Sequence, residues 1–191
     1  MSTNPISHAT PEEYLERERL SDERHEYLYG EIVAMARPWP AHGVIVNNVA
    51  FGLRARLESQ GCRVFTESLR ISVGWGKLIS YPDVVLQCGE PAWVDDKRDT
   101  LTNPKFVVEV VSPSTADYDR GTKAYLYRML SSMSEYLLIH PEPIEIHHWR
   151  RLPANTWEVV TITDIDAIIH FASLDCDMAV SEIYKDIDRY R

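Results

Sequence analysis

Cysteine is scarce in this sequence of 191 residues, and Cys62, Cys88 and Cys176 lie far apart. No pair has the Cys-x-x-Cys spacing of a zinc knuckle, and an odd, scattered set does not form the disulfide framework of a small secreted domain. The sequence therefore predicts three ordinary thiols, with neither a structural zinc nor a disulfide.

Long apolar runs are also missing. No stretch approaches the roughly 20 residues that span a bilayer. Residues 1–14 are polar and contain no apolar segment of the kind found in a signal peptide. These absences argue against a membrane partner and a secretory signal, and we expect a cytoplasmic protein.

Positive charge is in short supply, because 20 Lys and Arg face 29 Asp and Glu, for a formal net charge of −9. Broad nucleic-acid affinity relies on Lys and Arg that neutralise phosphates, so this balance disfavours it. A local basic face remains compatible with the total. A cluster of carboxylates around a divalent metal would itself add to the negative charge.

Apolar residues make up 45% of the chain, which favours a single globular domain over residues 1–191. Periodicity and turn residues predict helices at 10–20, 41–60, 119–130 and 180–191, a hairpin at 26–36, and strands at 62–67, 69–73, 82–86, 106–111, 136–139, 144–150 and 156–162. Helices that separate groups of strands indicate an α+β fold with a mixed sheet. We place its core at about 10–150 and a C-terminal β/α extension at 151–191.

One carboxylate, Glu109, interrupts the apolar run FVVEVV at 106–111. Side chains alternate along a strand, and here both faces are apolar, as in a central strand covered on two sides. An ionised glutamate is costly to bury there without compensation. Two interpretations are about equally supported by this strand alone: a pair with a core cation, or a metal ligand.

Asp83 stands at the head of a second apolar run, Val84-Val85-Leu86, which could pair with the first. Together with Glu109 it offers two hard oxygen ligands at neighbouring strand ends, which suits Mg²⁺ or Mn²⁺. Asp119 and Lys123 are four residues apart on the following helix. They form either a surface pair or, if Lys123 points into the site, a cation that stabilises developing negative charge.

The ordered set of Glu26, Pro82-Asp83 and Glu109-Val110-Val111 resembles the PD-(D/E)XK nuclease superfamily. More closely, VVEVVSPST, then Asp119, Lys123 and Tyr127, then SEYLLIHP, is similar to the Uma-two family of restriction-endonuclease-like proteins. EYLYGEIVAM followed by His42 is similar to the opening of that family. The resemblance extends from about residue 10 to about residue 150.

The resemblance implies a restriction-endonuclease-like core, with Asp83 and Glu109 as ligands of Mg²⁺ or Mn²⁺ and Glu26 as a further catalytic acid. It also implies nucleic acid, DNA in particular, as the substrate, and a homodimer that cuts two strands. The superfamily places a lysine two residues after the second acid, where this chain has Val111. The family pattern moves that lysine to the following helix, which makes Lys123 the catalytic substitute.

The same resemblance gives supporting positions to His42, Asp119 and Tyr127. From the residues alone, a helix-start histidine whose hydrogen bonds are satisfied is favoured over a functional role for His42. Glu67 is a weaker candidate for a third acid. The histidines His140, His147 and His148 lack HExxH spacing, and we expect them to be structural or exposed.

Three functions therefore compete. The first is a metal-dependent nuclease. The second is a non-catalytic binding module on the same fold, which the charge of −9 and Val111 favour. The third is a metal-dependent hydrolase of small phosphoesters. The position of the Lys123 ammonium relative to the Asp83 and Glu109 carboxylates distinguishes an assembled site from a dispersed one.

Overall fold

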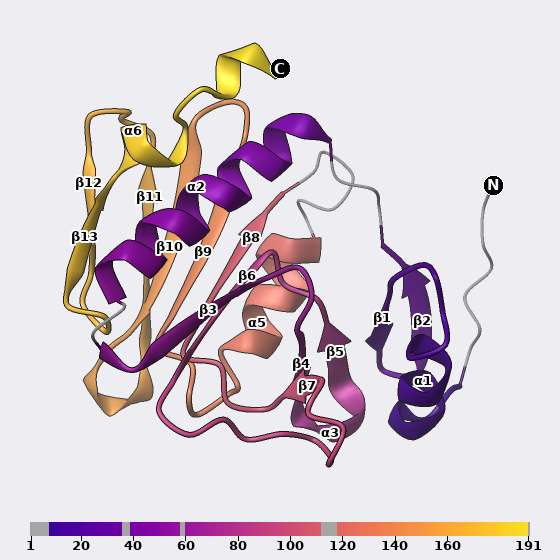
Figure 1. Ribbon diagram of the computed structural model, residues 1–191. Coiled ribbons are helices and arrows are strands. Elements are labelled where there is room, and N and C mark those ends of the chain that lie inside the picture. The colour runs from indigo at the N-terminus through magenta and orange to yellow at the C-terminus, as the bar shows by residue number, and fades with distance from the viewer. Residues whose placement is uncertain (1–7, 36–38, 58–59, 112–117, 191) are drawn as a thin grey trace.

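A six-stranded mixed sheet forms the centre of the computed structural model, which describes residues 8–35, 39–57, 60–111 and 118–190 (Figure 1). Its strand order is β11-β10-β9-β8-β6-β3. The strands are β3 Cys62–Thr66, β6 Val84–Cys88, β8 Phe106–Val110, β9 Glu135–His140, β10 Glu145–Arg151 and β11 Trp157–Ile162. Strands β8 and β9 pair in parallel and the other neighbours pair antiparallel, so the predicted mixed sheet is confirmed.

A second sheet of five strands has the order β2-β1-β5-β4-β7. Its members are β1 His25–Leu28, β2 Glu31–Ala34, β4 Arg70–Val73, β5 Leu78–Ser80 and β7 Thr100–Leu101, and the turn labelled α3, Gly74–Lys77, joins β4 to β5. The predicted hairpin is present as β1 and β2. Its two-residue turn, Tyr29-Gly30, has positive φ at both positions, the geometry that matches the twist of the flanking strands.

Helix α2, Pro40–Leu57, runs across one face of the large sheet (Figure 1). Its predicted apolar stripe is buried against β6 and β8, where Ile45, Val49 and Leu53 pack with Phe106 and Val108. Near the N-terminus, helix α1, Pro11–Glu18, begins with the predicted capping box, in which Thr10 and Glu13 each accept the other's backbone N–H. These two hydrogen bonds fix the start of the helix that leads into β1.

The opposite face of the sheet carries a π-helical turn, η2 at Asp119–Lys123, followed by α5 at Ala124–Tyr127. Here Val107, Val111, Leu138 and Tyr127 form a second apolar cluster. Strand β8 is therefore buried on both faces, as its composition predicts. The predicted helix 119–130 is shorter than expected, since its helical part ends at Tyr127.

The C-terminal part adds a two-stranded sheet that periodicity did not predict, β12 Ile168–Phe171 with β13 Cys176–Ala179. The remaining short helices are η3 Pro153–Asn155, α6 Val180–Ile183 and η4 Ile187–Arg189. The predicted helix 180–191 is thus divided into two short turns. Ile169, Phe171 and Met178 add to the core beneath α2, so this extension covers the sheet.

The expectation of three free thiols is wrong. Cys62 on β3 and Cys88 on β6 are direct cross-strand partners and form a disulfide, while Cys176 is free. Their separation of 26 residues gives no indication of this pairing, because the strand register decides it. Within the described ranges, no helix is long and apolar enough to cross a membrane.

Candidate active site

Lys123 and Glu109 meet in the interior, on the face of β8 that η2 covers. Nζ of Lys123 lies 3.2 Å from Oε1 of Glu109, 2.8 Å from Oε1 of Glu26 and 3.3 Å from Oδ1 of Asp119. The lysine is 6% exposed and Glu109 is 5% exposed. The structure thus brings together four of the predicted residues, from β1, β8 and η2, around one ammonium group.

Burial and charge act in opposite directions on this group. Burial favours the neutral amine, but the carboxylates of Glu109 and Glu26 outweigh it and raise the pKa of Lys123 well above its ordinary value. Burial also raises the pKa of Glu109 well above its ordinary value, although Lys123 counteracts this rise. The lysine is therefore a cation at neutral pH, whereas burial favours the neutral form of Glu109 and the charge of Lys123 favours its ionised form.

Asp83 precedes β6, the antiparallel neighbour of β8. The backbone N–H of Val110 donates to its Oδ2 at 2.6 Å, and Nε2 of His42 lies 3.0 Å from its Oδ1. Burial lowers the pKa of His42, but the hydrogen bond and charge of Asp83 more than offset this, so the pKa is raised overall. The histidine at the start of α2 therefore orients Asp83 and adds positive character beside it.

Tyr127 lies one turn beyond Lys123 and approaches the same carboxylate. Its hydroxyl donates to Oε1 of Glu109 at 2.7 Å and lies 3.0 Å from Oγ of Ser80. Two donors, Lys123 and Tyr127, thus converge on one oxygen of Glu109.

A cavity of about 420 Å³ opens beside these groups. Every predicted site residue except the buried Tyr127 lines it: Glu26, His42, Asp83, Glu109, Asp119 and Lys123. The described residues that line it include seven carboxylates, whereas their full cations are Arg24 and Lys123. Such an excess of negative charge in a partly enclosed space favours a bound cation.

The donor set fits a hard divalent ion. Asp83 and Glu109 present carboxylate oxygens to the cavity, which suits Mg²⁺ or Mn²⁺ with water completing the coordination. Glu67 also comes close: ligand atoms of His42, Glu67 and Asp83 all lie within 4.8 Å of one another. The site has room for the ion that the resemblance implies.

Glu67, the weaker candidate for a third acid, lies beside Asp83 in the structure. It follows β3, and its backbone N–H donates to the carbonyl of Asp83 at 3.2 Å. Pairing of the predicted strands 62–67 and 82–86 would have placed it beside Asp83, so the signal lay in strand adjacency rather than in any local motif. Tyr118 was missed, and its ring lies 5.4 Å from Nζ of Lys123.

Comparisons with known proteins agree with this fold. The Uma2 family model, described as "Putative restriction endonuclease", matches residues 11–180. Two uncharacterized proteins of Synechocystis sp. are similar: one is 31% identical over 185 residues, covering 96% of this chain and 95% of the relative, and the other is 28% identical over 163 residues, covering 85% and 92%. A crystal structure from Anabaena variabilis, titled a putative nuclease of DUF820, superimposes with a TM-score of 0.77 at 18% identity, covering 94% of this chain and 99% of that one.

Proposed function

The chain belongs to the Uma2 family, and from this membership and the geometry of the cavity we propose that it is a metal-dependent nuclease. One observation carries the proposal. The ammonium of Lys123 lies 3.2 Å from Glu109 in a cavity that Asp83 also lines, which supports Lys123 as the substitute for the lysine missing at position 111. The parts of the superfamily motif therefore meet although they do not follow its spacing.

In this proposal Asp83 and Glu109 hold Mg²⁺ or Mn²⁺, with Glu26 and Asp119 as further acids around Lys123. A divalent ion at such a site activates water and offsets the charge of a phosphodiester in its transition state. Hydrogen bonds fix the two proposed ligands before an ion binds. His42 and the Val110 N–H orient Asp83, and Tyr127 orients Glu109.

Lys123 has two roles in the proposed reaction. It counteracts the rise that burial causes in the pKa of Glu109, and it presents fixed positive charge to the side of the cavity where a phosphate would bind. Charge positioned in a site with little water stabilises a developing anion at low reorganisation cost. Lys123 is thus the residue on which activity is expected to depend most after the two ligands.

We propose that the substrate is DNA. Each chain would form a single restriction-endonuclease-like domain, and two chains would cut the DNA as a homodimer in the cytoplasm. The net charge of −9 gives little general attraction to DNA. Productive binding is therefore expected to need the divalent ion.

The test is cleavage of supercoiled plasmid by the full chain with Mg²⁺ or Mn²⁺. We expect Asp83→Asn to abolish cleavage and Lys123→Met to lower its rate by about 100- to 1000-fold, the usual cost of removing a preorganised electrostatic group. Asp96→Asn and Lys97→Met, both on exposed positions, are the matched controls and should keep full activity. Linear product formed without nicked circles would support a dimer that cuts both strands.

Equal activity in wild type and all four variants would overturn the proposal, because the cleavage would then come from a contaminant. Metal binding without cleavage of DNA or RNA would favour the non-catalytic binding module. Cleavage of a small phosphoester alone, unaffected by added DNA, would favour the third function.

A further inference from the structure

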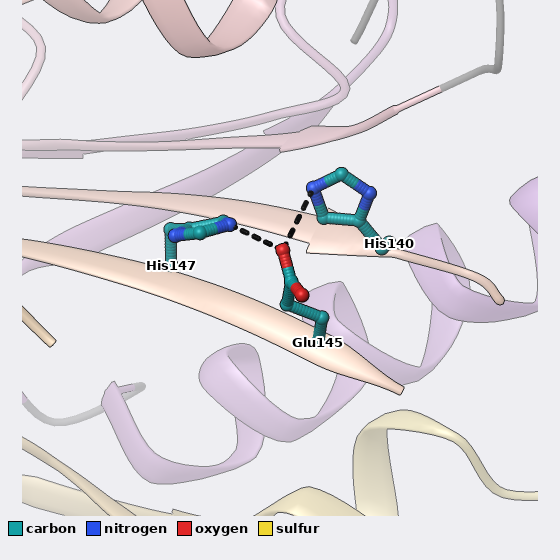
Figure 2. A group of neighbouring side chains, drawn as sticks. All are labelled: His140, Glu145 and His147. Carbon is teal, nitrogen blue, oxygen red and sulfur yellow. Dashed lines mark hydrogen bonds and ion pairs between the residues drawn. The ribbon is translucent and has the colours of Figure 1, made fainter. Parts of the chain in front are cut away.

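A second group of metal-ligand side chains lies on the same face of the large sheet as Glu109, on β9 and β10, which are one and two strands away from β8. Figure 2 shows its three members. Glu145 and His147 are two residues apart on β10, and His140 on β9 is the direct cross-strand partner of Glu145. Nε2 of His147 lies 2.6 Å from Oε1 of Glu145, and Nε2 of His140 lies 3.8 Å from it. Two imidazole nitrogens and one carboxylate oxygen thus converge on a common point.

A cation already sits at that point. Nη2 of Arg120 lies 3.2 Å from Nε2 of His140, 3.1 Å from Nε2 of His147 and 3.1 Å from Oε1 of Glu145. A guanidinium nitrogen of this kind carries two hydrogens and cannot serve three acceptors. Nor can Nε2 of His147 donate to Glu145 while it accepts from Arg120. Hydrogen bonds therefore leave the group incompletely satisfied, whereas a metal ion would bind all three atoms at once.

The surroundings of these three side chains favour metal binding. Oγ1 of Thr161, on the cross-strand partner position of β11, lies 3.2 Å from Nδ1 of His147. A hydroxyl that accepts the proton on Nδ1 leaves Nε2 free for a metal, as in many metal-bound histidines. The side chain of Arg120 is 48% exposed, so it can move into solvent when an ion takes its place.

We propose that His140, Glu145 and His147 form a transition-metal site suited to Zn²⁺, with Arg120 as the competing cation that leaves when the ion binds. Two imidazoles and one carboxylate, with water as the fourth ligand, match Zn²⁺ chemistry. The oxygen-rich cavity around Asp83 instead suits Mg²⁺ or Mn²⁺. This second site does not depend on the proposed nuclease activity.

The experiment is calorimetric titration of the full chain with Zn²⁺, with the visible absorption of Co²⁺ as a second report on ligand type. The test variants are His147→Ala, the nearly isosteric Glu145→Gln, and Arg120→Gln. His170→Ala, a surface histidine paired with Asp177, is the matched control. Thermal unfolding of each variant checks that the fold is kept, and Glu145→Gln preserves the test if His147→Ala unfolds.

We expect His147→Ala and Glu145→Gln to lower the affinity for one equivalent of Zn²⁺ by about 100-fold or more. Even a residue that only hydrogen-bonds to a metal ligand contributes about 10- to 100-fold to metal affinity. Arg120→Gln should bind Zn²⁺ more tightly, and His170→Ala should match wild type. The group of His42, Glu67 and Asp83 could also take Zn²⁺, so His42→Ala is titrated as well. Unchanged binding in His147→Ala and Glu145→Gln, or a loss confined to His42→Ala, would overturn the proposal.

Discussion

Replacement of Lys123 by methionine removes the one ammonium that three buried carboxylates share. Methionine keeps an unbranched stem in the same space, so the change is chiefly one of charge. Glu26, Glu109 and Asp119 lie 2.8, 3.2 and 3.3 Å from the lost nitrogen. Loss of one partner of a buried ion pair costs about 3–5 kcal/mol, because the remaining charge is left uncompensated. We expect the free energy of unfolding to fall by this amount near neutral pH.

The loss should depend on pH in a definite direction. Burial raises the pKa of Glu109, and Lys123 counteracts that rise, so the variant's Glu109 has a still higher pKa. A group whose pKa is raised on folding stabilises the protein at low pH, and this stabilisation is lost as pH rises through the folded-state pKa. The difference between wild type and Lys123→Met should therefore be large at pH 8 and shrink towards pH 5, where Lys123 itself stays charged.

Divalent metal gives a second check on the same charge. An ion in the cavity would replace part of the missing positive charge, so Mg²⁺ should stabilise the variant more than wild type. At 100 times the dissociation constant, bound ligand adds about 2.7 kcal/mol. Urea unfolding followed by tryptophan fluorescence, at pH 5 and pH 8 and with and without Mg²⁺, measures all three effects.

Lys97→Met is the matched control, because Lys97 is exposed and such changes usually stay within about 0.5 kcal/mol. A Lys123→Met protein as stable as wild type at pH 8 would refute the reasoning, since the carboxylates would then need no cation. A large loss that is the same at pH 5 and pH 8 would point to packing rather than to charge.

Two further predictions concern other buried or partly buried polar contacts. Tyr127→Phe removes the hydroxyl that donates to Glu109 at 2.7 Å. Urea unfolding should show that the free energy of unfolding falls by about 1.5–3 kcal/mol, which is typical of a hydrogen bond to a charged group. An unchanged free energy of unfolding would mean that the hydroxyl does not hold the carboxylate. Hydrogen bonds from Arg19 and Arg70 hold the pKa of Asp99 well below its usual range, against the effect of burial. Asp99 therefore stabilises the protein above about pH 4, and Asp99→Asn should be less stable than wild type at pH 6, with a difference that narrows as the pH falls to 3; a constant difference would contradict this.

The central strands and the helix over them could be predicted from the sequence. Periodicity identifies the apolar stripe of α2 and the doubly buried strand β8, because both signals are local. Glu109 and Asp83 stood out as charges beside apolar runs. The meeting of Lys123 with Glu109 was expected only through a family resemblance, since no spacing rule connects two residues that are 14 positions apart in the sequence.

Features that depend on strand register and on tertiary packing could not be predicted from the sequence. Cys62 and Cys88 pair because β3 and β6 align in one particular register, which composition does not reveal. Glu67 reaches Asp83 through the same pairing. The hairpin of β12 and β13 is short. Because the apolar Ile168 is exposed beside the buried Ile169 and Phe171, the sequence does not show the apolar and polar alternation of a half-buried strand.

The π-helical turn at Asp119–Lys123 makes the site sensitive to insertions and deletions as well as to substitutions. Each residue of an α-helix turns the chain by about 100°, and a π-helical hydrogen bond spans five residues rather than four. Removal of one residue within this turn would therefore rotate everything that follows. Lys123 and Tyr127 approach Glu109 from successive turns of this segment, and both contacts would be lost together. Sequence length between β8 and α5 is thus under constraint in its own right, and a one-residue indel in 119–123 should be tolerated far less than one at the exposed Lys97 in the loop between β6 and β7.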